Sequence, residues 1–258
     1  MKYRVVVNIY IDTHCHMSRN DYNDIPFLIN KIKNSGVSKI IVNGCCIESC
    51  KEILELTKKY DIVYGAIGLH PTELDKFDES DFVWLEEHIN DEKIIALGEI
   101  GLDYHYDDTD KNKQLYVFKK QLEIAKKHNK PIIVHSRDAI QDTYNILKEY
   151  DLKGSLHCFG SSLEMAREFI KLGYLIGVGG VVTFKNAKNI VNVIKNIDLE
   201  YILLETDSPY LTPEPDRGKQ NDSSYIPVIA SKIALEKNVS VEKVKNVTGN
   251  NARGVFDF

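Results

Sequence analysis

The sequence has few of the features that stabilise secreted proteins or hold a chain in a membrane. Its five cysteines are an odd number and include no Cys-x-x-Cys pair, which argues against a disulfide framework and a structural zinc knuckle. No apolar run reaches the about 20 residues of a membrane-spanning helix, and the run at residues 5–11 has no signal-peptide cleavage pattern. We therefore expect reduced thiols, a cytoplasmic location and no membrane partner.

An excess of positive charge is also missing, because 33 lysine and arginine residues face 38 aspartate and glutamate residues and the formal net charge is −5. This balance argues against a basic surface for tight, non-specific nucleic-acid binding, but it is compatible with a nucleic-acid substrate at a small local site. Linkers rich in proline, glycine or serine are absent as well. We therefore expect residues 1–258 to form one domain. We also expect a monomer, because no exposed apolar stripe stands out.

What the sequence does contain is a regular alternation of short aliphatic segments and longer charged segments with helical periodicity. The predicted strands are mostly apolar rather than alternating, which is typical of parallel strands buried on both faces. They are residues 5–12, 39–43, 62–67, 94–98, 131–135, 154–157, 174–177 and 201–205. The predicted helices are residues 25–35, 48–59, 80–89, 111–128, 139–150, 163–172, 187–196, 225–237 and 241–248.

Eight strand–helix units predict an α/β fold, a TIM-type (β/α)8 barrel, regular or distorted, with an extra C-terminal helix. Such barrels commonly need about 250 residues in one domain, close to the 258 present. A doubly wound open sheet is the competing fold, but no Gly-x-Gly-x-x-Gly turn follows the first predicted strand.

Ionisable residues concentrate where the predicted strands end, which in a barrel is the mouth that carries the chemistry. One histidine in such a place is more often a packing or capping residue, but five at one mouth need a common purpose, because buried polar groups cost free energy unless partnered. Imidazole and carboxylate suit zinc, manganese and similar ions. The residues are His14, His16, His70, Glu99, Asp103, His135, Arg137, His157, Glu205 and Asp207.

The His-x-His pair after the first strand adds to this interpretation. His14 and His16 are two apart in an extended chain, so their side chains leave the same face and can bind one ion. Asp12 shares that face and can instead orient a ligand. The pattern is weak alone and gains weight from the ionisable residues at the other strand ends.

Together these segments resemble the TatD-type metal-dependent deoxyribonucleases of the amidohydrolase-like barrel superfamily. The resemblance is specific, because the matching segments run in order over nearly the whole chain. They are Asp12-Thr-His14-Cys-His16, Gly68-Leu-His70-Pro71, Gly98-Glu99-Ile-Gly-Leu-Asp103-Tyr104, His135-Ser-Arg137-Asp138-Ala, His157-Cys-Phe159, Glu205-Thr-Asp207-Ser-Pro-Tyr-Leu, Arg217-Gly218, Asn251-Ala-Arg253 and Phe256.

The chain departs from the family pattern at two places. It reads His157-Cys-Phe-Gly160-Ser161 where the family usually has His-Cys-Phe-Ser-Gly, and Asn221-Asp222-Ser223 where the family tends to have Asn-Glu-Pro. Neither change affects an expected metal ligand, so both bear on substrate preference more than on catalysis.

The resemblance implies two divalent metal ions, with zinc, magnesium and manganese as candidates. His14, His16, Glu99 and Asp207 would hold the first ion. Glu99, His135 and His157 would hold the second, with Glu99 as the bridge. We expect Glu99 and Asp207 to be the catalytic residues, with Asp207 acting as the general base, or alternatively as a ligand only.

Five further residues are candidates for substrate binding. The fork of donors on Arg137 suits a phosphate oxygen, with a salt bridge at a helix start as the alternative. Arg217 is a second candidate phosphate contact. His70 can contact the scissile group or orient a neighbour. Asp103 and Tyr104 can line the cavity or support the loop after the fourth strand.

The function predicted from these residues is phosphodiester hydrolysis with a metal-activated water, as a 3′-to-5′ exonuclease on single-stranded DNA. RNA is an alternative substrate. A metal-dependent hydrolase of another ester or amide, such as an aminoacyl-tRNA deacylase, and a non-catalytic metal-stabilised scaffold are the other hypotheses. Glu99 stands where many barrels of the superfamily carry a carbamylated lysine, which favours the phosphodiesterase, and the complete ligand set argues against the scaffold.

Overall fold

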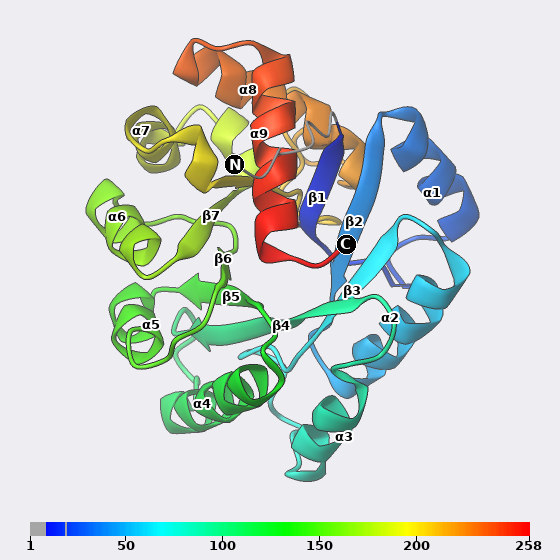
Figure 1. Cartoon of the computed structure of the whole chain (residues 1–258), viewed down its shortest axis with the longest axis vertical. Coiled ribbons are helices and arrows are strands. Elements are labelled where there is room, and N and C mark those ends of the chain that lie inside the picture. Colours follow the sequence, from blue (N-terminus) through cyan, green and yellow to red (C-terminus); the bar gives the residue numbers. More distant parts are fainter. Residues whose placement is uncertain (1–8, 19) are drawn as a thin grey trace, which may run out of the picture.

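The strands follow one another around a barrel in sequence order, each hydrogen-bonded in parallel to the next (Figure 1). The computed structural model describes residues 9–18 and 20–258. The strands are β1 (Tyr10–Cys15), β2 (Val37–Asn43), β3 (Val63–Ile67), β4 (Ile94–Asp103), β5 (Ile132–Arg137), β6 (Gly154–Leu156), β7 (Tyr174–Val178) and β8 (Ile202–Leu204). The α-helices are α1 (Ile25–Asn34), α2 (Ile47–Lys59), α3 (Ser80–His88), α4 (Lys111–His128), α5 (Ile140–Leu147), α6 (Leu163–Lys171), α7 (Lys188–Asn196), α8 (Ile226–Lys237) and α9 (Val241–Val255). Short 3-10 segments are η1 (Gly180–Thr183), η2 (Leu199–Tyr201) and η3 (Ser223–Tyr225).

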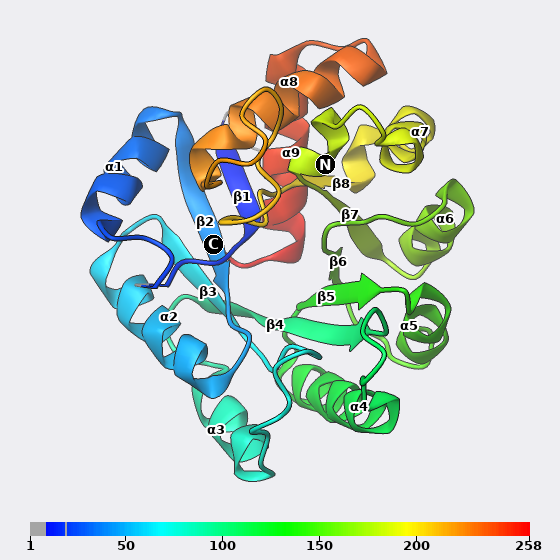
Figure 2. The same cartoon turned by 180° about the vertical axis from the view of Figure 1, so that it is seen from behind.

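This arrangement confirms the predicted TIM-type barrel and its extra C-terminal helix. The helices surround the strands in both views (Figures 1 and 2). Every residue of β1 and of β4 is buried, which explains why the first residues of β4, 94–97, are apolar rather than alternating; the polar residues of both strands lie toward their carboxyl ends.

Several observed boundaries differ from the expected ones. The sequence predicts that β1 ends at residue 12 and β4 at residue 98, whereas these strands continue to Cys15 and Asp103. Residues 5–8 of the first predicted strand lie outside the described residues. The last helix is expected to end at residue 248 but continues to Val255. It does so because Asn251 is bound in place, its Nδ2 donating to two backbone carbonyls near the start of β8, each at 2.8 Å.

Two irregularities in the sheet lie at candidate metal ligands. Between two successive pairs with β2, β1 advances by three residues, from 12 to 15, while β2 advances by two, so β1 contains one extra residue around His14. In the same way β4 advances from 97 to 100 while β5 advances by two residues, so β4 contains one extra residue around Glu99. Bulges of this kind interrupt the alternation of faces and re-aim a side chain. Both ligands therefore have orientations that a regular strand would not give them.

β8 closes the barrel against β1 through bonds made by the segments that carry the ligands. The backbone N–H groups of Thr206 and Asp207 donate to the His14 carbonyl at 3.3 and 2.9 Å. The fully buried Asp12 carboxylate accepts from Thr206 N at 3.0 Å and from Thr206 Oγ1 at 2.6 Å. Asp12 thus joins the first and last strands beside the candidate site, and its contacts favour the positioning role over metal binding.

The opposite end of the barrel is closed by α9, which lies beside β1 in Figure 1. Ala252 and the fully buried Phe256 pack against the inner faces of the strands. Their inward-facing partners include Ile11, Ile41, Ala66, Ile133 and Leu203. Among the described residues this end of the interior is therefore a packed core, and the cavity that reaches the ionisable cluster opens at the other mouth.

The ends of several helices follow from local chemistry. Asp24, Asp110 and Ser240 each accept a hydrogen bond from a backbone N–H in the first turn of α1, α4 and α9. Asn129 and Asn238 adopt left-handed conformations that end α4 and α8. Within the described ranges, no helix combines the length and the hydrophobicity needed to cross a membrane.

Candidate metal centre

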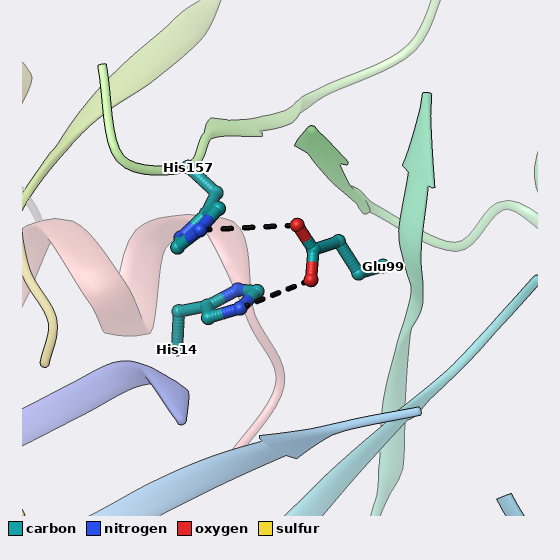
Figure 3. A group of neighbouring side chains, drawn as sticks. All are labelled: His14, Glu99 and His157. Carbon is teal, nitrogen blue, oxygen red and sulfur yellow. Dashed lines mark ion pairs between the residues drawn. The ribbon is translucent and has the colours of Figure 1, made fainter. Parts of the chain in front are cut away.

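The carboxylate of Glu99, which is almost fully buried, lies at the centre of the ionisable cluster. Figure 3 shows it facing His14 and His157, which come from opposite sides of the barrel mouth. Their rings stack, with centroids 3.4 Å apart and planes 21° apart. The two oxygens of Glu99 face different sets of donors, and each set is described in turn.

The first set surrounds Oε2 of Glu99. The Nε2 atoms of His14 and His16 lie 3.2 Å from each other and 3.3 and 3.5 Å from this oxygen. Asp207 Oδ1 lies 3.6 Å from both nitrogens. Donors around a tetrahedral zinc ion, with bonds of about 2.0–2.1 Å, are about 3.3–3.4 Å apart. The four donors expected at the first site therefore fit one small divalent ion.

The second set faces Oε1 of Glu99. His135 Nδ1 lies at 2.8 Å, His70 Nε2 at 3.5 Å and His157 Nε2 at 3.8 Å from that oxygen. In the described part of the chain, the compact group of possible ligands here is His70, Glu99 and His135, whereas His157 groups with His14 and Glu99. The geometry thus adds His70, expected to contact substrate, to the candidate ligands of the second ion.

Asp207 reaches the cluster from an unusual backbone conformation. Its φ is 56°, in the left-handed region that residues other than glycine rarely adopt. Such a conformation costs free energy and persists when the surroundings hold it, here through the bond from Asp207 N to the His14 carbonyl. The strain sits at the residue predicted to be the general base.

The charges in the cluster suit a bound cation. Burial, together with His157, lowers the pKa of His14 to about 4, which keeps its imidazole neutral and available as a ligand. Burial opposes the ionised form of Glu99, but His14 and other histidines outweigh it and hold the pKa of Glu99 well below its usual value. Burial likewise opposes a charged His157, yet Glu205 and further carboxylates raise its pKa to about 10. The carboxylates of the cluster thus favour a positive charge among them, which a divalent ion would supply.

Several candidate ligands have neighbours on the side away from Glu99 to which the sequence analysis gave no role. His16 Nδ1 lies 3.0 Å from the Asn43 carbonyl. Glu205 Oε1 lies 3.2 Å from His157 Nδ1, while Asp207 Oδ1 lies 3.5 Å from Nε2 of the same ring. Outer carboxylates of this kind fix the orientation of a metal-binding histidine. The sequence analysis placed Glu205 at the end of the last strand but gave it no role, and the structure shows it beside His157.

Gly177 on β7 provides the space for Glu205. A Cβ atom at this position would lie 2.3 Å from Glu205 Oε2 and 2.7 Å from its Cδ, and the Glu205 side chain is fully buried. Glycine is therefore required beside this carboxylate.

Replacing Gly177 by alanine is expected to lower the free energy of unfolding by about 1–3 kcal/mol, because a buried carboxylate must move. Urea unfolding followed by circular dichroism measures this change. Gly254→Ala in α9 is the matched control: its added Cβ meets no atom within 4 Å, and stability should stay equal or rise. Equal unfolding free energies for Gly177→Ala and wild type would show that Glu205 is not confined by β7.

A cavity of about 620 Å³ opens beside the cluster. Its walls include the candidate ligands His135, His157 and Asp207 together with Arg137 and Tyr210. A molecule in this cavity can therefore touch the candidate metal ligands and the arginine expected to bind phosphate.

The other expected substrate contacts lie in different surroundings. Asp103 accepts from His135 Nε2 at 3.0 Å and is buried, so it orients that ring. The Tyr104 hydroxyl donates to Asp142 at 3.0 Å, which supports the loop after β4. The Arg217 guanidinium packs 4.2 Å from the centroid of the Phe184 ring.

Cys45 is a neighbour of the cluster that the sequence analysis gave no role. Its Sγ lies 3.7 Å from His16 Nδ1, and with His16 and Glu99 it forms a further group of possible ligands. The available signal was its position two residues after the end of β2, at the same mouth as the histidines.

Comparison with known proteins agrees with this geometry. The family model described as TatD related DNase matches residues 11–257. The uncharacterized metal-dependent hydrolase YabD of Bacillus subtilis is 41% identical over 95% of this chain and 98% of that protein. The uncharacterized metal-dependent hydrolase YcfH of Escherichia coli is 35% identical over 95% of each.

Solved structures share the barrel. The TatD homologue YjjV of Escherichia coli superposes with a TM-score of 0.90 at 31% identity, covering 96% of this chain and 98% of that one. A hydrolase of the TatD family from Entamoeba histolytica has a TM-score of 0.82 at 23% identity, covering 98% and 99%, which shows the common fold. The match along almost the entire sequence, together with a cluster suited to metal, establishes that this chain belongs to the TatD-related DNase family of metal-dependent hydrolases.

Proposed function

We propose that the protein hydrolyses phosphodiester bonds in DNA, as a 3′-to-5′ exonuclease on single strands that uses two divalent ions. The observation that carries this proposal is that the two oxygens of Glu99 face different histidines. Oε2 faces His14 and His16, and Oε1 faces His135 and His70. A carboxylate so placed can bridge two ions. Two ions about 3.5–4 Å apart would lower the pKa of a water and stabilise both oxygens of an in-line phosphoryl displacement.

Asp207 is placed to move the proton of the attacking water. Its carboxylate lines the cavity, and its Oδ1 is within 3.6 Å of His14 Nε2, His16 Nε2 and His157 Nε2. Burial works against its charge, but His157 and other histidines lower the pKa of Asp207 below its usual value, so it is ionised near neutral pH and can accept a proton.

Arg137 is placed to hold the phosphate. It is exposed on the wall of the same cavity, with its guanidinium 5.8 Å from the centroid of the Tyr106 ring. No ion pair among the described residues involves it, which favours a phosphate contact over a salt bridge at the start of α5. Its planar fork of donors suits two oxygens of one phosphate.

The test compares wild type with Asp207→Asn on a 3′-labelled single-stranded DNA, an RNA of the same sequence, an aminoacyl ester and a cyclic amide. Wild type should prefer the DNA, and kcat of the variant should fall about 10²–10⁴-fold, because a positioned general base contributes that much. Asp138→Asn alters a charge on the same cavity wall and should change kcat less than about threefold.

Either of two results would count against this proposal. Equal rates for wild type and Asp207→Asn would remove Asp207 from the chemistry. Cleavage of the ester or amide alone, with metal bound, would assign the same centre to another hydrolase reaction.

A further inference from the structure

A solvent-exposed aromatic side chain stands next to the candidate metal ligands, three residues beyond Asp207. Tyr210 is 61% exposed, although most large apolar side chains of the chain are buried. Among residues 9–18 and 20–258, no side-chain hydrogen bond, ring stacking or cation–π contact involves the Tyr210 ring or hydroxyl, so much of the side chain is available to a ligand. An exposed aromatic ring in this position can contact a ligand bound beside the candidate metal ligands.

The backbone that carries Tyr210 is held firmly. Tyr210 N donates to the Asp207 carbonyl at 2.9 Å, and the Tyr210 carbonyl accepts from Asn221 Nδ2 at 2.6 Å. The same Asn221 Nδ2 donates to the Thr206 carbonyl at 2.9 Å, and Asn221 is fully buried. One buried side chain therefore fixes both ends of the turn that contains the candidate general base and the exposed ring.

The next residue is fixed as well. Leu211 has a φ of 55°, which a branched side chain rarely adopts, and it is partly exposed beside Tyr210. Its carbonyl approaches Gly180 so closely that a Cβ there would lie 2.1 Å from the oxygen. The turn thus presents two apolar side chains to solvent on a rigid support, an arrangement suited to a flat apolar ligand group.

Tyr210 also separates two hollows of different charge. It lines the cavity of about 620 Å³ that contains Arg137, and a second hollow of about 440 Å³ that contains His16 and the acidic residues Glu48 and Glu73. The first cavity offers a phosphate the guanidinium of Arg137, beside the carboxylates of Asp138 and Asp207, whereas the second hollow has no lysine or arginine among its described lining residues and repels a phosphate. A polynucleotide in the first cavity would bring a base, not a phosphate, against the tyrosine ring.

We propose that Tyr210 is a stacking platform for a nucleobase next to the scissile phosphodiester and thereby selects single-stranded over duplex ends. This inference rests on the proposed phosphodiesterase function and names how that site recognises its substrate. Every base has a π-face, so stacking on an aromatic ring is tolerant of sequence. A base must be unpaired and free of its neighbours to stack there, which excludes a base held in a duplex.

The test uses wild type, Tyr210→Ala and Tyr210→Phe with two 3′-labelled single strands. One strand is ordinary, and in the other the terminal nucleotides are abasic. We expect Tyr210→Ala to lower kcat/KM about tenfold or more on the ordinary strand, within the range for loss of one stacked base, and to leave the abasic strand unchanged. Tyr210→Phe should behave as wild type on both strands.

A control and a second readout keep the outcomes distinct. Tyr116→Ala removes another exposed tyrosine, on the outer helix α4, and should leave both rates unchanged. Fluorescence anisotropy with the same strands reports binding without turnover, and the preference for the ordinary strand should vanish in Tyr210→Ala.

An equal loss of kcat/KM on both strands would overturn the stacking role, and so would a Tyr210→Phe variant as slow as Tyr210→Ala. If wild type binds the ordinary strand in preference but cleaves neither, the proposed reaction fails while the stacking platform stands. If it binds neither strand, both fail.

Discussion

Glu99→Gln is expected to release both metal ions and to lower the rate of hydrolysis at least about 10⁴-fold. Glutamine fills the same buried space but offers one neutral oxygen where Glu99 presents two charged ones, to His14 and His16 on one side and to His135 on the other. Two divalent ions cannot share such a group, and the acidification of water that they supply is lost with them.

Elemental analysis of the purified variant measures the loss of metal, and its rate of hydrolysis on single-stranded DNA measures the loss of activity. Glu73→Gln removes an acidic group from the neighbouring hollow and should keep about two ions per chain and the wild-type rate. Circular dichroism of the Glu99 variant should match wild type, because the packing is conserved. A variant that retained two ions and a rate within tenfold of wild type would refute the bridging assignment.

Chelation is expected to abolish hydrolysis completely, and added manganese, magnesium or zinc to restore it. The donors around Glu99 are imidazole nitrogens and carboxylate oxygens, a set that suits such ions. Removal of the metal should also lower the free energy of unfolding, since an ion present at about 100 times its Kd stabilises a fold by about 2.7 kcal/mol.

The rate on single-stranded DNA and the thermal midpoint should therefore fall together after dialysis against chelator and recover together on titration with metal. The Glu99→Gln variant serves as a matched control, because its midpoint should not respond to the chelator. Turnover that continues in a chain whose metal content has been measured as zero would contradict the metal-dependent mechanism for this substrate.

The sequence predicts the fold well, because the signals that specify a barrel are local. Runs of buried aliphatic residues separated by amphipathic segments indicate the strands, and the ends of those strands indicate the mouth. The same logic places His135 and His157 correctly at one mouth, since the carboxyl ends of parallel strands in a barrel lie together.

The arrangement inside the site depends on register, which a single sequence does not reveal. The inserted residues around His14 and Glu99 change which face each side chain takes, and a pattern of alternation cannot locate them. Glu205 and Asp207 are two apart, yet they contact opposite nitrogens of the His157 ring because the backbone turns at Asp207. Such distinctions arise from tertiary packing.

The exposure of Tyr210 is another property that composition does not indicate. In sequence it is one aromatic residue of an apolar pair, and tyrosine is a residue type of intermediate burial, so its exposure does not follow from its identity. The turn that carries the ring is held by the bonds of Asn221, made across the long loop, and by the bond from Tyr210 N to the Asp207 carbonyl.

The seam between β1 and β8 has a consequence for the biosynthesis of the enzyme. His14 and His16 leave the ribosome well before Asp207 and the strand that closes the barrel. Until β8 and Asp207 have been synthesised, the edge of β1 lacks its partner and the proposed ligand set is incomplete. We therefore expect the enzyme to become competent only after β8 has joined β1.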